Sequence, residues 1–411
     1  ARELLIQGER NGRRYKFYHE LIASVVRDRM PLELREETAV SMRKAISVDS
    51  VASSISKKDL DLINIEIFQW NVLDDRGEIG RLINVVRDLI VHGSIEGGLR
   101  AIKSLKSGLL HLGDNEAFLF DLDYLKALAL YNRGNFKEAE EVLNRLTERR
   151  AQDSGLDIDL LAAKVSIRLG LFDEAEKFVQ GILQADDASL ELVVGALRCA
   201  NTIARDKGMY DQADSIFRDI LSRVGRLEAL EAQLQCDILR TQARTACYLD
   251  DQYEVGLAAA KSAISIASEN GLKRELGNSY LALAEVQRHF DENSSARFSY
   301  QQAIEIGKDC ADKDSIFWSY LGLSDSNLLL REFGEARRIL NEIEWMVDFW
   351  GGERPFEYAH FSLSLSVLEY IENMDQKPEI PDFYSTHGIT WPENYLQQLM
   401  KKPNSPVAKR F

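Results

Sequence analysis

Small and apolar residues recur along the middle of the chain with a cadence that predicts pairs of helices. In the clearest copies an aromatic residue follows a glycine by two positions, and an alanine follows the same glycine by five. Apolar residues four and seven positions after that alanine lie on one helical face. Glycine permits the left-handed turn between two helices, the aromatic residue fills the gap between them, and alanine lets their backbones approach. These copies are Gly134, Phe136 and Ala139; Gly170, Phe172 and Ala175; and Gly208, Tyr210 and Ala213.

Weaker copies extend the array in both directions when the small residue is held fixed. The successive spacings of this residue are 41, 36, 38, 43, 40 and 40 residues. We therefore predict seven helical pairs, with a repeat array over residues 80–350. The small residues are Gly98, Ala139, Ala175, Ala213, Gly256, Ala296 and Ala336.

The array resembles the tetratricopeptide repeat (TPR), whose unit carries the pattern W-x-x-L-G followed by A-x-x-x-F. Trp318, Leu321 and Gly322 match the first part, and Ala213 and Phe217 match the second. Each spacing exceeds the usual period of about 34 residues, which indicates longer helices. The resemblance implies an all-α, right-handed superhelical solenoid. In such a solenoid the first helices of the pairs line a concave binding groove.

Basic residues gather on the helices expected to line that groove, where they offer bidentate contacts to phosphate or carboxylate. A protein or peptide, or an anionic small-molecule signal, would suit them. A second interpretation stays open, because the same arginines can pair with Asp237, Glu275 or Glu285 of adjacent repeats. The candidate groove residues are Lys164, Arg168, Arg198, Arg205, Arg240, Arg244, Arg288 and His289.

Residues 1–47 do not follow the repeat cadence. Asn11-Gly12 marks a turn between two partly alternating segments, and a helical pattern follows from Leu21. This order is similar to the end of a winged-helix module. The segment Phe17-x-His19-x-Leu21-Ile22 resembles one that closes the winged-helix part of signal-transduction ATPases with numerous domains (STAND proteins), ahead of a helical repeat sensor. The alternative is a capping hairpin and helix.

The STAND resemblance implies a ligand-sensing arm of an ATPase switch in signal transduction, transcription activation or antiviral defence, with an oligomer forming after activation. No phosphate-binding loop of the G-x-x-x-x-G-K-[S/T] type occurs in this chain, so any ATP or ADP would bind a neighbouring domain, and we expect no cofactor here. The alternative function is a free-standing scaffold for protein–protein interaction. A chain that starts at Ala1 rather than methionine is expected for a piece of a longer protein, and equally for a processed protein.

The remaining segments are assigned by periodicity and composition. Residues 48–79 read as connecting helices, with Leu60, Ile63 and Ile67 on one face. Residues 351–400 read as C-terminal capping helices, beginning at Pro355, and residues 401–411 as a flexible tail. The aromatic cluster of Trp345, Phe349 and Trp350 is expected to cover the open end of the core.

Composition and charge narrow the function further. The 411 residues include 45% hydrophobic side chains, seven prolines and a net charge of −15, which suits a helix-rich chain and disfavours nucleic-acid binding by the repeats. Residues 1–47 differ, with ten Lys or Arg against seven Asp or Glu. No run of 18 apolar residues and no signal peptide occurs, so we expect a cytoplasmic protein without a membrane segment.

Catalytic and metal-binding patterns are weak. The four cysteines lack C-x-x-C spacing and are expected to be buried apolar residues: Cys199, Cys236, Cys247 and Cys310. His19-Glu20 begins like a zinc-protease motif, but Ala23 stands where the second ligand belongs. We therefore expect no catalytic residue, no metal site and no enzymatic activity in this chain.

Overall fold

The computed structural model describes residues 76–91, 94–109, 115–149, 155–249, 251–310, 312–350 and 354–373, together with 378, 380–387, 389 and 396. Regular structure in these residues is helical throughout, without a strand. The all-α prediction is confirmed. The winged-helix-like piece at 1–47, the connecting helix through Leu60 to Ile67 and the tail at 401–411 lie outside the described residues.

The chain forms two compact units, Ala1–Leu125 and Lys126–Phe411, and each is described by itself. In the first unit, α5 (Arg76–Val91) and α6 (Ile95–Leu109) form an antiparallel pair. Leu82 and Val86 of α5 and Leu105 of α6 are buried. The helix α7 (Glu116–Arg133) begins here, where Asp123 pairs with Lys106, and continues into the second unit.

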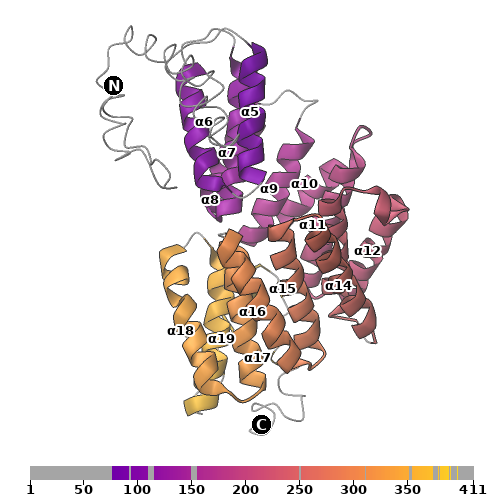
Figure 1. Cartoon of the computed structure of the whole chain (residues 1–411), viewed down its shortest axis with the longest axis vertical. Helices are drawn as coiled ribbons and strands as arrows, with labels where there is room; N and C mark the ends of the chain where they lie inside the picture. Colours follow the sequence, from indigo (N-terminus) through magenta and orange to yellow (C-terminus); the bar gives the residue numbers. More distant parts are fainter. Residues whose placement is uncertain are drawn as a thin grey trace, which may run out of the picture. The chain divides into compact units, whose positions relative to one another are not determined.

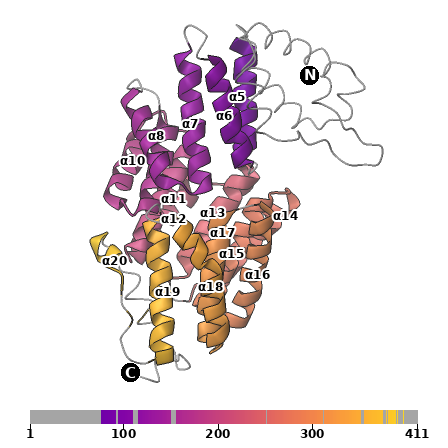
Figure 2. The same ribbon diagram turned by 90° about the vertical axis from the view of Figure 1, so that its left-hand side faces the viewer.

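The second unit continues as consecutive packed helix pairs joined by short turns, a TPR-like solenoid (Figure 1). Helices α15 to α19 run side by side in both views (Figure 2). A short 3-10 turn (Leu227–Ala229) precedes α13. The helices after α7 are α8 (Phe136–Arg149), α9 (Leu156–Leu169), α10 (Phe172–Gln184), α11 (Leu190–Asp206), α12 (Tyr210–Val224), α13 (Ala232–Ala246), α14 (Tyr253–Glu269), α15 (Lys273–His289), α16 (Asn293–Cys310), α17 (Lys313–Leu329), α18 (Phe333–Trp350), α19 (Pro355–Asn373) and α20 (Asp382–Thr386).

The small residues of the cadence lie on the second helix of successive pairs, as predicted. Ala139, Ala175, Ala213, Ala296 and Ala336 are fully buried, and Gly98 and Gly256 are buried as well. At Gly256 an added Cβ would lie 3.1 Å from the Ala246 side chain of the preceding helix. A larger residue there would push the two helices apart.

One backbone feature repeats at each turn within these pairs of the second unit. A residue with positive φ stands two positions before the first residue of the second helix. In the first three copies it is the predicted glycine, and in the last three it is a residue with a side chain. The six residues, with their φ angles, are Gly134 (84°), Gly170 (79°), Gly208 (74°), Asp251 (59°), Asp291 (69°) and Arg331 (64°).

The aromatic residues that were predicted to be buried differ in their exposure. Phe136 and Phe172 are buried between helices, as predicted, whereas Tyr210 is half-buried and faces a cavity instead. At the C-terminal end Trp350 is buried, but Trp345 and Phe349 are 60% and 72% exposed. The expectation that these two cover the core is therefore wrong.

The C-terminal helices return to the first helices of the second unit. Pro355 begins α19, as predicted, and α19 contacts both α17 and α9. Phe383 of α20 lies at the Gly170 turn, where an added Cβ would come within 2.7 Å of its ring. The solenoid of this unit thus closes on itself.

Candidate functional site

A chamber of about 400 Å³ lies inside the solenoid of the second unit and opens to solvent. Its wall comes mainly from the first helices of successive pairs, α9, α11, α13, α15 and α17, and α19 completes it. The sequence analysis predicted a binding groove on these first helices. A volume of this size falls in the range of about 300–1,000 Å³ typical of ligand pockets.

Five of the eight residues predicted for the groove line this chamber: Arg168, Arg205, Arg244, Arg288 and His289. The other three lie outside its wall. Lys164 on α9 is half-buried, and Arg198 and Arg240 form ion pairs between repeats.

Carboxylates balance the arginines of the chamber. With Arg274, five arginines face five acidic side chains in the lining, so the chamber is not the basic stripe expected from the sequence. Four arginines of the wall form ion pairs with carboxylates of other helices, with nitrogen–oxygen distances of 2.7 to 3.8 Å. The pairs are Arg244–Glu285 (2.7 Å), Arg274–Asp312 (2.9 Å), Arg168–Asp314 (3.1 Å) and Arg288–Asp325 (3.8 Å).

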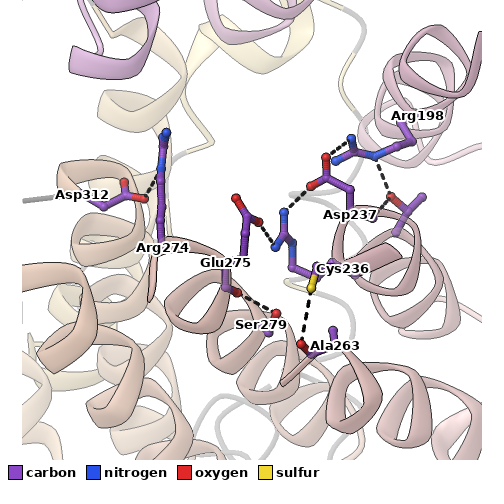
Figure 3. Close-up of polar contacts among 10 residues, drawn as sticks. Arg198, Cys236, Asp237, Ala263, Arg274, Glu275, Ser279 and Asp312 are labelled. Carbon is purple, nitrogen blue, oxygen red and sulfur yellow. Dashed lines mark hydrogen bonds and ion pairs between the residues drawn. The ribbon is translucent and has the colours of Figure 1, made fainter. Parts of the chain in front are cut away.

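A ladder of ion pairs also joins α11, α13 and α15 (Figure 3). Asp237 of α13 accepts hydrogen bonds from Arg198 of α11 and from Arg240, and Arg240 also pairs with Glu275 of α15. Burial favours the neutral acid, but Arg198 and Arg240 outweigh it and lower the pKa of Asp237. For these arginines, the interpretation as pairs with adjacent repeats is confirmed.

Two charged groups of the chamber wall take part in none of these ion pairs. They are Arg205 and Asp206, at the end of α11. Arg205 donates to Asn201 Oδ1 at 3.2 Å and to Thr202 Oγ1 at 3.4 Å. Asp206 has neither a hydrogen bond nor an ion pair to the rest of the described chain. Burial raises its pKa to about 6, although Arg205, Arg168 and Arg244 act to lower it. One cation and one carboxylate are thus presented to a ligand.

Aromatic rings flank this corner of the chamber. Tyr210 and Tyr248 stack with ring centroids 4.6 Å apart and an interplanar angle of 6°. The edge of His289 meets Tyr248 at 5.1 Å. Stacked rings of this kind offer a flat apolar surface with polar tips.

His360 of α19 lies on the opposite wall. Its Nδ1 is 2.9 Å from the carbonyl oxygen of Phe356, and Trp318 packs edge-on at 4.9 Å. Burial lowers the pKa of His360 to about 3, so the ring is neutral at physiological pH. The carbonyl can only accept, so Nδ1 carries the proton and Nε2 has the lone pair.

Sequence reasoning named Glu285 as an arginine partner but missed the other acidic members of the wall, and it assigned no aromatic residue to the wall. One signal was present, because α17 carries polar residues that are buried and hydrogen-bonded, including Ser324, Asp325 and Ser326. A helix buried on all sides that keeps polar residues marks a site where they find partners.

The cysteines carry no redox or metal pattern in the described residues. Cys199, Cys236 and Cys247 are buried, in agreement with the sequence, whereas Cys310 is half-buried. No group of three His, Cys, Asp or Glu side chains suited to a metal ion occurs in the described ranges. Within the same residues, no helix has the length and apolarity to cross a membrane.

No family model and no curated protein matches this chain. Among solved structures, it is similar to a Rap protein complexed with Competence and Sporulation Factor. The TM-score is 0.61 and the identity 10%, over 81% of this chain and 95% of that one. This likeness shows the fold alone, and it agrees with the TPR-like solenoid.

Two further structures are more distant. A signal transduction ATPase with numerous domains and a tetratricopeptide repeat sensor, from Pyrococcus horikoshii, gives a TM-score of 0.48 at 14% identity. The match covers 95% of this chain and spans 57% of that protein's length. Aspartyl phosphate phosphatase F from Bacillus subtilis gives 0.40 at 14% identity, over 80% of this chain and 86% of that one.

Proposed function

We propose that this chain is a binding module that takes a peptide, or a peptide segment of a partner protein, into the chamber. The observation that carries the proposal is a pair of charged groups in the chamber wall that form no ion pair with other helices. They are Arg205 and Asp206, beside the Tyr210–Tyr248 stack. A peptide supplies both signs of charge and apolar side chains in one ligand. The Rap protein of similar fold is itself complexed with a factor.

An anionic small molecule fits this wall less well, because five carboxylates share the lining with the arginines. A ligand that carried negative charge alone would meet repulsion from Asp206 and Asp325. Catalysis is also a poorer fit, since the ionisable groups of the wall are mostly held in ion pairs between helices.

We propose further that the module is the sensor arm of a STAND-type ATPase switch. The support is the segment Phe17-x-His19-x-Leu21-Ile22 ahead of the repeats. Ligand binding in the chamber would then release a nucleotide-binding domain, and oligomers would follow in the cytoplasm. A free-standing scaffold is the alternative, and the native polypeptide decides between them: an attached phosphate-binding-loop domain supports the switch.

The binding proposal is tested with a library of short random peptides displayed on phage and selected on the full chain. The best peptide is then measured by fluorescence anisotropy against the wild type, Arg205→Ala and Asp206→Asn. We expect each substitution to weaken binding about tenfold or more, because each leaves a ligand charge unpaired. Arg338→Ala, on the exposed face of α18, is the matched control and should bind like the wild type. Unchanged affinity in both chamber variants would overturn the proposal.

A further inference from the structure

The C-terminal helices hold the solenoid closed at two turns that lie far away in sequence. We call Arg354, α19, α20 and His387 the strap. Arg354 donates from Nε to the carbonyl oxygen of Gly134 at 2.9 Å and from Nη2 to that of Arg133 at 3.2 Å. At the second turn, Phe383 and His387 of the strap lie against Gly170.

Charged groups join these two contacts into one network. Arg168 of α9 pairs with Glu357 of the strap and with Asp314 of α17. Asp314 in turn accepts a hydrogen bond of 2.5 Å from Arg354. Asp314 of α17 thus connects Arg354 of the strap with Arg168 of α9.

The network is incomplete. Nε of Arg168 and Oε2 of Glu357 are buried and have no hydrogen-bond partner in the described chain. A buried polar atom without a partner destabilises the arrangement that buries it. The closed position of the strap is therefore less stable than its number of contacts implies, and water would satisfy both atoms on opening.

The strap also forms part of the chamber wall. Phe356, His360 and Ser364 of α19 line the chamber together with residues of α9 and α11. A molecule large enough to fill the chamber would contact the strap and these helices together. Occupancy and closure are therefore energetically linked, and each changes the equilibrium of the other.

We propose that the strap is a gate, which opens at the Gly134 and Gly170 turns to admit a ligand to the chamber and closes over it. The inference deepens the binding function proposed above, but its test needs no ligand. A failure of the gate is therefore distinguishable from a failure of peptide binding.

Two cysteines report on the gate within one molecule. Cys247 lines the chamber, whereas Cys236 is buried on α13 with its thiol directed to the carbonyl oxygen of Ala263. The full chain is treated with N-ethylmaleimide, and the labelling rate of each cysteine is followed by peptide mass spectrometry. The variants are Arg354→Met, which removes the guanidinium, and Gly170→Ala, whose Cβ would displace Phe383.

A gate predicts that both variants accelerate labelling of Cys247 about tenfold or more while the rate at Cys236 stays that of the wild type. Arg338→Met and Gly225→Ala are matched controls, since Arg338 is exposed and a Cβ at Gly225 meets open space. Unchanged labelling of Cys247 in both variants would overturn the proposal. So would equal acceleration at both cysteines, which would show that the strap belongs to the common core.

Discussion

Arg354 donates a hydrogen bond of 2.9 Å to the carbonyl oxygen of Gly134, which lies 220 residues earlier in the chain. The Arg354 side chain is 1% exposed, and its guanidinium lies 3.9 Å from the Trp350 ring centroid and 5.0 Å from that of Phe136. A buried arginine is stable only with such partners. This contact ties the C-terminal helices to the first turn of the second unit.

Gly134→Ala should destabilise the protein more than its backbone angle alone explains. A Cβ on this residue would fall on the Arg354 guanidinium, in addition to the strain at a φ of 84°. We expect a loss of about 2–4 kcal/mol in the free energy of unfolding, measured with urea. Gly225→Ala is the control, because its φ of 68° is similar and its surroundings are open. Equal losses in the two variants would show that Arg354 does not occupy the Gly134 turn.

Arg331→Gly should stabilise the protein. Arg331 has a φ of 64° at a turn where the earlier repeats use glycine. Relief of this left-handed conformation outweighs the added flexibility of the unfolded chain, so we expect a gain of about 0.5–1 kcal/mol in chemical denaturation. The same change at Arg338, inside α18, should cost about 1 kcal/mol. A loss of stability at position 331 would contradict the assignment of this turn.

Asp206→Asn should raise stability at neutral pH but not at pH 3.5. Burial raises the Asp206 pKa from 3.8 to about 6, so between these values the folded protein keeps a proton that the unfolded chain releases. Stability therefore falls as pH rises through this window, and asparagine removes that fall. We expect a gain of about 1 kcal/mol at pH 7.5 in urea unfolding. A variant that gains equally at both values would show that the carboxylate charge is not the cause.

Arg240→Met should cost about 3–5 kcal/mol, because it leaves Glu275 in a buried site without its cation, while Asp237 keeps only Arg198. Adding Glu275→Gln to the same chain should recover most of the loss. Thermal and urea unfolding of the single and double variants measure this. A double variant as unstable as the single one would mean that packing of the arginine stem, rather than charge, holds the site.

Local features of the fold were predictable from the sequence. The small residues from Gly98 to Ala336 lie on second helices because a close helix crossing needs a small side chain in every repeat. Pro355 begins α19, as expected for a residue without an amide hydrogen. The cross-repeat partners Asp237, Glu275 and Glu285 were also foreseeable, since successive first helices place side chains opposite one another.

The sequence carries no local pattern for the contact between α19 and α9. It carries none for the corner of the chamber formed by Arg205, Asp206, Tyr210 and Tyr248 either. Arg354 follows a Gly-Gly sequence that indicates a helix end, and nothing local connects it with Gly134 or Arg168. The balance of charges in the chamber depends on α17 and α19 packing near α9. These helices are far apart in sequence, so no local pattern predicts their contact. Likewise, Tyr210 occupies the position at which Phe136 and Phe172 are buried, but it is half-buried and stacks on Tyr248, which lies 38 residues further along the chain.

The central claim, that the described residues of the second unit close on themselves around a chamber, is tested most directly by a double-mutant cycle between Arg168 and Glu357, which are 189 residues apart. Arg168→Met, Glu357→Gln and the double variant are unfolded in urea. Closure predicts a coupling free energy of about 1–3 kcal/mol, while a control cycle of Arg338→Met with Glu357→Gln should show additivity within about 0.5 kcal/mol. Additive effects of Arg168 and Glu357 would contradict the closed solenoid.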